Sequence, residues 1–372
     1  MKSKGLFTIS EKEFHDHIYS RKFLLFLSII LVVTIIGMAT GSVDYNEQID
    51  QYNENLQLVD DDSADNYIQS WYNRPSVMTI FNGVGILLVT LGAILGIAMG
   101  FDLITKEKES KSLKILLSHP IYRDEVINGK AAGGIMALVL ALAATFIISL
   151  GIMLIFGIVP SGDELFYILL FGLAAFLMIF SYFAISMFMS TIAEDSGNAL
   201  VYTLIVFVFL SSLLPVFVWG STMDLIIGQP PEYPEDLINE MNEVRMSSYS
   251  ETVVVSVSGD EEAVVRDPLE GNEVWQKYMA DLQDYWNKRQ MISGFVNLLS
   301  PTNNFQTIMT TLTYPEIASL SSSSIYGGSP DLEEKGISEV LGSLLWNFIA
   351  LIAVPAIFFG AAYVRFMRLD VR

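Results

Sequence analysis

Long apolar stretches alternate with polar, charged segments along the whole chain. Each stretch has the length of a membrane-spanning helix, which needs about 20 apolar residues. The pattern predicts six spanning helices, at 23–41, 76–101, 129–157, 165–190, 199–220 and 340–364. Hydrophobic residues make up 52% of the 372 residues, too large a share for an ordinary soluble domain. We therefore expect an all-α polytopic membrane protein.

Ionisable side chains are almost absent from the six runs. The runs contain no Asp, Glu or Arg, and their one Lys is Lys130, at the edge of the third run. A secondary carrier or a proton pump usually keeps an ionisable group at membrane depth, because that group binds or relays the ion. The pattern argues against a stand-alone secondary carrier, which is kept as the less favoured alternative.

Lys and Arg are unevenly divided between the two sides of the membrane. With the N-terminus inside, the inner segments are 1–22, 102–130, 191–198 and 365–372, and they hold 14 of the 21 basic residues but 11 of the 41 acidic ones. Since Lys and Arg favour the cytoplasmic side, we expect a plasma-membrane protein with both termini in the cytoplasm. The strongly acidic outer side argues against nucleic acid as a partner.

The polar segments divide the chain into four parts. Residues 1–22 form a cytoplasmic N-terminus, 23–220 carry the first five spans, 221–339 form an outer domain, and 340–372 carry the sixth span and the C-terminus. The outer domain is predicted to be α+β. It has a β-hairpin pattern at 251–268 and an aromatic stripe at helical spacing that we expect in its core. The stripe comprises Trp275, Tyr278, Leu282 and Trp286.

Three glycines in the second run are spaced four residues apart. Gly92, Gly96 and Gly100 lie on one face of the predicted helix, and small residues at this spacing let another helix approach closely. The neighbour is either another helix of this chain or a helix of a second copy.

The segment between the second and third runs is highly charged around a short apolar turn. Ser112 is a good N-cap residue, and Leu113, Leu116 and Leu117 share one helical face. Pro120 ends the turn. This short amphipathic helix either lies on lipid headgroups or places its leucine face in a groove of a cytoplasmic partner.

The order of residues in this segment resembles the ABC-2 family of ABC-transporter permeases. The matching residues are Glu107, Glu109, Ser112, Leu113, Leu116, Leu117, Ser118, Pro120, Arg123, Gly129 and Lys130. The pattern departs at Lys111, where the family commonly has Gly. Residues 11–23 resemble the family's amphipathic elbow helix, and "LLSPTNNF" at 298–305 resembles the segment before its last span.

The resemblance implies a six-span permease subunit with an elbow helix and a coupling helix at 105–120. Its partners would be an ABC ATPase subunit, a second permease copy or a homologous permease, membrane lipid and an extracytoplasmic protein. Coupling to the ATPase would fall to Glu107, Glu109, Ser112, Leu113, Leu116, Leu117, Pro120 and Arg123.

The chain lacks the G-x-x-x-x-G-K-[ST] pattern of a phosphate-binding loop, and it has no zinc-protease or serine-hydrolase motif. We therefore expect no enzymatic activity, no catalytic residue, and no cofactor or metal in this chain. ATP and Mg²⁺ would bind the partner ATPase. The favoured function is an ABC exporter subunit. The alternative is an ATP-driven assembly factor that transmits motion to an outer partner and transports nothing.

Overall fold

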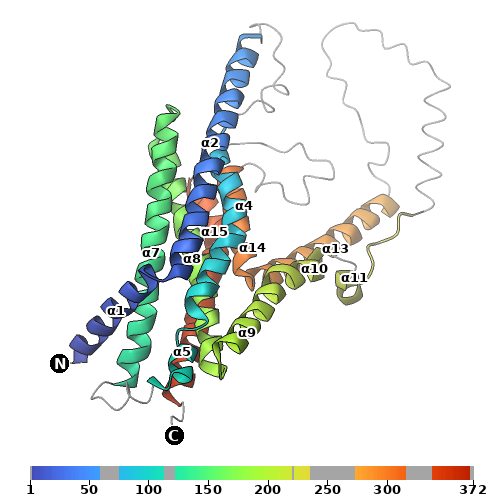
Figure 1. The fold of residues 1–372 in the computed structure, drawn as a ribbon. Helices are drawn as coiled ribbons and strands as arrows, with labels where there is room; N and C mark the ends of the chain where they lie inside the picture. Colours follow the sequence, from blue (N-terminus) through green and yellow to red (C-terminus); the bar gives the residue numbers. More distant parts are fainter. Residues whose placement is uncertain are drawn as a thin grey trace, which may run out of the picture. The chain divides into compact units, whose positions relative to one another are not determined.

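The computed structural model describes residues 2–58, 75–112, 122–219, 222–234, 273–315 and 337–368. Within these ranges the chain is helical and contains no strand (Figure 1). The α+β outer domain therefore finds no support here, and the hairpin expected at 251–268 lies outside the described residues.

Six helices among the described residues are long and apolar enough to cross a membrane, as predicted. They are α2 (Arg21–Leu58), α4 (Met78–Gly100), α7 (Arg123–Ile155), α8 (Gly162–Ile192), the segment formed by α9 (Ser196–Val208), η1 (Phe209–Leu213) and α10 (Leu214–Trp219), and α15 (Ile337–Met367). The π-helical turn η1 ends two residues before Pro215, whose missing amide N–H interrupts regular helical bonding.

Helix α2 is much longer than its apolar run. The run ends at residue 41, but the helix continues to Leu58. Beyond the run, Ser42 and Tyr45 are buried on the same side of the helix as Met38. The length of the apolar run reflects the thickness of a membrane and does not fix where the helix ends. A helix ends at a stop signal such as proline, or where its packing is lost. No proline follows the run before Pro75.

The glycine face of α4 lies against α8. A Cβ atom at Gly96 would lie 2.5 Å from the carbonyl oxygen of Ile179, and one at Gly100 would lie 2.7 Å from that of Phe183. A Cβ atom at Gly92 would first meet the side chain of Ile179, at 3.0 Å. The three glycines therefore allow two helices of the same chain to approach closely.

Helix α8 is the centre of the bundle, with α4, α14 and α15 packed against it. Helix α14 (Pro301–Thr313) is capped by Ser300, whose hydroxyl accepts a hydrogen bond from the amide of Asn303. Its 13 residues give a length of about 20 Å, which is short of a membrane crossing. Residues 297–315, which were predicted to lie in the outer domain, cluster with the spanning helices.

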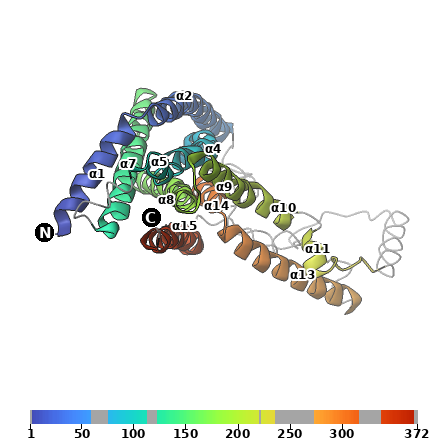
Figure 2. The same ribbon diagram turned by 60° about the horizontal axis from the view of Figure 1, so that its bottom comes forward.

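Helix α1 (Lys2–Ile18) packs along α7, as both ribbon views show (Figures 1 and 2). Glycines of α7 make this contact close: a Cβ atom at Gly133 would lie 2.9 Å from the amide nitrogen of Phe14 and the carbonyl oxygen of Ser10. A Cβ atom at Gly129 would meet Ile9 at 2.7 Å. The fit holds α1 beside the first part of α7.

The described residues within 216–296 cluster as a second unit. In it, Asp224 of α11 (Thr222–Ile227) accepts hydrogen bonds from Tyr285 (2.8 Å) and Arg289 (2.7 Å) of α13 (Glu273–Leu298). Leu282 and Tyr285 are buried. The predicted core residues Trp275, Tyr278 and Trp286 are only half-buried.

Candidate functional site

The predicted coupling residues begin on a short helix, α5 (Thr105–Glu109), directly after the second span. Glu107 and Glu109 lie on α5 and Ser112 lies three residues beyond its end, while Leu113, Leu116, Leu117 and Pro120 lie outside the described residues. Arg123 begins α7 and donates a hydrogen bond to the carbonyl of Met367 at the end of α15.

Lys108 attaches α5 to the end of α8. Its ammonium group donates hydrogen bonds to the carbonyl oxygens of Ser190 (3.3 Å), Thr191 (2.8 Å) and Ala193 (2.9 Å). The last carbonyls of a helix have no partner within the helix and carry the negative end of its dipole. A lysine placed there satisfies these carbonyls and fixes α5 to α8.

Further hydrogen bonds join α5 and the residue before it to the end of α8 and the beginning of α9. The hydroxyl of Ser190 accepts hydrogen bonds from the amides of Ile104 (3.0 Å) and Thr105 (3.1 Å). The carboxylate of Glu109 accepts one from the amide of Ser196, the first residue of α9. Any displacement of α5 therefore displaces the ends of two spanning helices.

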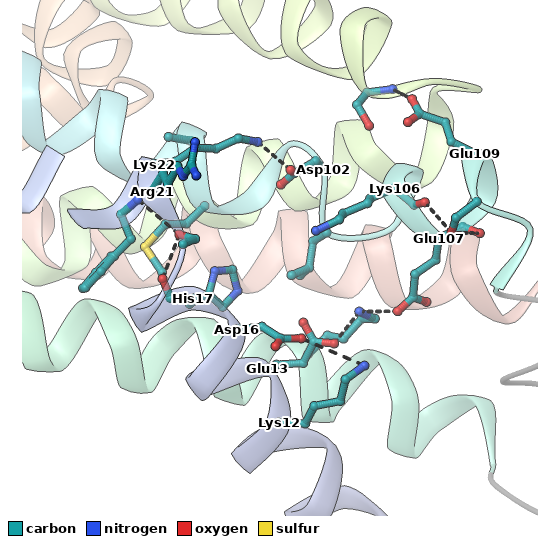
Figure 3. Close-up of a pocket in the computed structure, with 18 of the residues that line it drawn as sticks. Lys12, Glu13, Asp16, His17, Arg21, Lys22, Asp102, Lys106, Glu107 and Glu109 are labelled. Atoms are coloured by element: carbon teal, nitrogen blue, oxygen red, sulfur yellow. Dashed lines mark hydrogen bonds and ion pairs between the residues drawn. The ribbon is translucent and has the colours of Figure 1, made fainter. Parts of the chain in front are cut away.

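A buried ionic cluster joins α5 to α1 and α7. The ammonium group of Lys130 lies 2.6 Å from a carboxylate oxygen of Glu13 and 2.7 Å from one of Glu107 (Figure 3). The three side chains are 4%, 10% and 16% exposed, respectively. We call these residues the Lys130 cluster. Burying charges is costly unless they are paired, so these contacts hold the three helices in one arrangement.

His17 of α1 lies close to the Lys130 cluster. Burial lowers the pKa of its imidazole below the ordinary value, and the carboxylates of Glu13 and Asp102 offset only part of that effect. The ring is therefore neutral at pH 7. Asp102 itself pairs with Lys22, the second residue of α2, at 2.6 Å.

Most residues that hold α5 in place were not predictable from the sequence. Glu13, Lys130 and Ser190 are distant from α5 in sequence, and only the folded chain brings them to it. One signal was present: Lys130 is the only charged residue in the six apolar runs, and such a residue usually has a specific partner. The arrangement of the described residues suits the transmission of movement between helices.

Lys111, two residues after α5, has a φ of 55°, in the left-handed region that favours glycine. This is the position where the resembling family commonly has Gly. We expect Lys111→Gly to raise the free energy of unfolding by about 0.5–1 kcal/mol, because the strain relieved exceeds the entropy that glycine adds to the unfolded chain. Thermal unfolding of the purified protein measures it. As a control, Lys12→Gly at an exposed position of α1 should lower the free energy of unfolding by about 1 kcal/mol. A lower free energy of unfolding for Lys111→Gly would contradict the expectation.

The fold and the site together define a multi-pass helical membrane protein in which a short polar helix is bonded to the ends of several spans. A family model described as "ABC-2 family transporter protein" matches residues 7–371. The chain therefore belongs to the ABC-2 family of transporter proteins, which confirms the resemblance of its motifs. A search of the curated proteins found no match to this chain.

Proposed function

We propose that this chain is the permease subunit of an ABC exporter, driven by ATP that a separate subunit binds with Mg²⁺ and hydrolyses. Membership of the ABC-2 family supports a transporter permease. The observation that carries the rest is the attachment of α5 to α1, α7, α8 and α9 through Lys108, Glu109, Ser190 and the Lys130 cluster.

In this proposal the ATPase contacts the segment that follows α5. The leucine face expected at 113–117 docks into a groove of the ATPase, and nucleotide-driven closure of the ATPase pushes the segment. The contacts of Lys108 carry the movement to α8, and those of the Lys130 cluster carry it to α1 and α7. A second permease, either a copy of this chain or a homologue, completes the pathway.

The proposal requires both termini in the cytoplasm and the polar segment between the fifth and sixth spans outside. The natural chain has no cysteine, so a single Cys reports its own location. We expect an impermeant thiol reagent to label Ser322→Cys in intact cells and to label Ser3→Cys only after the cells are opened. Labelling of Ser3→Cys in intact cells would overturn this orientation.

The second unit supports the alternative function, that of an assembly factor that transmits motion to an outer partner. Its network of Asp224, Tyr285 and Arg289 fixes α11 to α13, and such a unit suits an extracytoplasmic protein partner. An assembly factor built this way would transmit motion and transport nothing. Reconstitution with the ATPase into vesicles separates the two functions: the exporter moves a labelled amphiphile in an ATP-dependent manner, whereas the assembly factor hydrolyses ATP and moves none.

A further inference from the structure

A cavity of about 660 Å³ lies between α1, α2, α4 and the α5 segment (Figure 3). Ligand pockets in proteins are typically of this size. One part of its wall is apolar and comes from the first and second spans: Phe23, Phe26, Leu95, Met99 and Leu103. The rest is mostly polar or charged, and its charged side chains come mainly from α1, α5 and the beginning of α2. The cavity thus lies where spanning helices give way to charged chain, at the level of lipid headgroups.

Among the described residues, two cations of the cavity wall have no acidic partner. Most other charges there are matched: Lys22 with Asp102, Lys12 with Asp16, and Lys130 with its two glutamates. Arg21 and Lys106 are exposed, and no carboxylate of the described chain pairs with either. Lys106 extends into the cavity between His17 and Asp102 (Figure 3). Arg21 and Lys106 are therefore available to an anionic group.

The deeper part of the cavity wall carries unmatched negative charge and would attract a cation. Lys130 faces two carboxylates, so this part of the wall carries an excess negative charge. The second carboxylate oxygen of Glu107 is buried and has no hydrogen-bond partner among the described residues, and neither has the buried Nε2 of His17. Buried polar groups are nearly always hydrogen-bonded, and a buried carboxylate needs donors. A cationic group with N–H donors would satisfy Glu107.

We propose that this cavity binds the headgroup of a phospholipid in which a phosphate ester carries a primary amine. The phosphate lies between Arg21 and Lys106, and the ammonium group donates to Glu107. The first part of the acyl chains lies on Phe23, Phe26 and Met99. The charge separation of this zwitterion matches that of the wall, with the cationic residues at the rim and the excess carboxylate inside. Glu107 also belongs to the Lys130 cluster, but binding of the lipid does not require the proposed exporter function.

Other lipid headgroups would make fewer favourable contacts with the cavity wall. A phosphocholine group has no N–H to donate to Glu107, and a phosphoglycerol group has no cation to neutralise it. A free phosphate ester with the same amine would make the polar contacts but not the apolar ones. Comparison with phosphocholine therefore tests the N–H donors, comparison with phosphoglycerol tests the positive charge, and comparison with the free phosphate ester tests the acyl chains.

The test is binding of short-chain phosphatidylethanolamine to the purified full-length chain, measured by native mass spectrometry and by thermal stabilisation. We expect it to bind about tenfold more tightly than the matched phosphatidylcholine, phosphatidylglycerol or free phosphoethanolamine. Lys106→Gln and Arg21→Gln should each weaken binding about tenfold, because each removes a charge-assisted hydrogen bond. Lys277→Gln, on α13, is the matched control and should bind as the natural chain does.

Unfolding temperatures without lipid show whether each variant is folded. Equal affinity for the three lipids would overturn the proposal, and so would unchanged affinity in folded Lys106→Gln and Arg21→Gln. Free phosphoethanolamine binding as tightly as the lipid would also overturn it, since the ligand would then be a soluble phosphate ester. Failure of these tests would leave the proposed exporter function intact.

Discussion

Lys130→Met is expected to lower the free energy of unfolding by about 3–5 kcal/mol, because it leaves two buried carboxylates without their cation. Lys130 is 4% exposed, and it lies within 2.7 Å of both Glu13 and Glu107. Methionine fills most of the same volume, so the change removes charge rather than packing. We also expect α1 to separate from α7, which protease cleavage after residues of α1 would detect.

Two comparisons isolate the charge effect. Lys12→Met breaks an exposed pair with Asp16, in which both side chains are 64% exposed, and should cost less than about 1 kcal/mol. Replacing Glu13 and Glu107 by Gln in the Lys130→Met background should recover much of the loss, since no unpaired charge is then buried. A Lys130→Met protein as stable as the natural chain would show that the Lys130 cluster does not hold these helices.

Gly96→Ala is expected to disrupt the packing of α4 on α8. The new Cβ atom would lie 2.5 Å from the carbonyl oxygen of Ile179 and 3.1 Å from the amide nitrogen of Phe183. Both are backbone atoms, so a side-chain rotation cannot relieve the overlap and the helices must separate. Overpacking of this kind typically costs about 1–3 kcal/mol and occasionally more. Thermal unfolding in detergent measures the loss.

The same helix supplies the control for Gly96→Ala. A Cβ atom at Gly83 would meet nothing within 4 Å, and alanine favours a helix over glycine by up to about 1 kcal/mol. Gly83→Ala should therefore be neutral or stabilising. A similar loss of stability in the two variants would mean that the effect of Gly96→Ala comes from the helix backbone and not from contact with α8.

The sequence predicted the spanning helices well, because a run of about 20 apolar residues has few other structures available to it. It predicted the end of α2 poorly, since the buried residues beyond the run, Ser42 and Tyr45, reveal their packing only in the folded chain. Helix α14 was missed as part of the bundle for a similar reason. Its 13 residues include many Thr and Asn, and its buried face is defined by α4, α8 and α15.

The candidate site was predictable only in part. Glu107 and Glu109 were selected by their place in a family pattern, and the structure adds what each carboxylate contacts. Their partners come from elsewhere in the chain: Glu13 and Lys130 are 117 residues apart. Local periodicity cannot predict such pairs, because they depend on how α1 docks on α7. An isolated lysine in an apolar run is the one local sign that a partner exists.

Co-purification of the ATPase with a chain that carries one charge on its leucine face shows whether the segment after α5 receives the ATPase. Leu116→Asp would bury an unpaired carboxylate in the contact, at a cost of several kcal/mol. We expect the Leu116→Asp chain to reach the membrane normally but to lose the ATPase, while the Lys114→Ala chain retains it. Retention of the ATPase by the Leu116→Asp chain at the natural yield would show that this segment does not bind the ATPase.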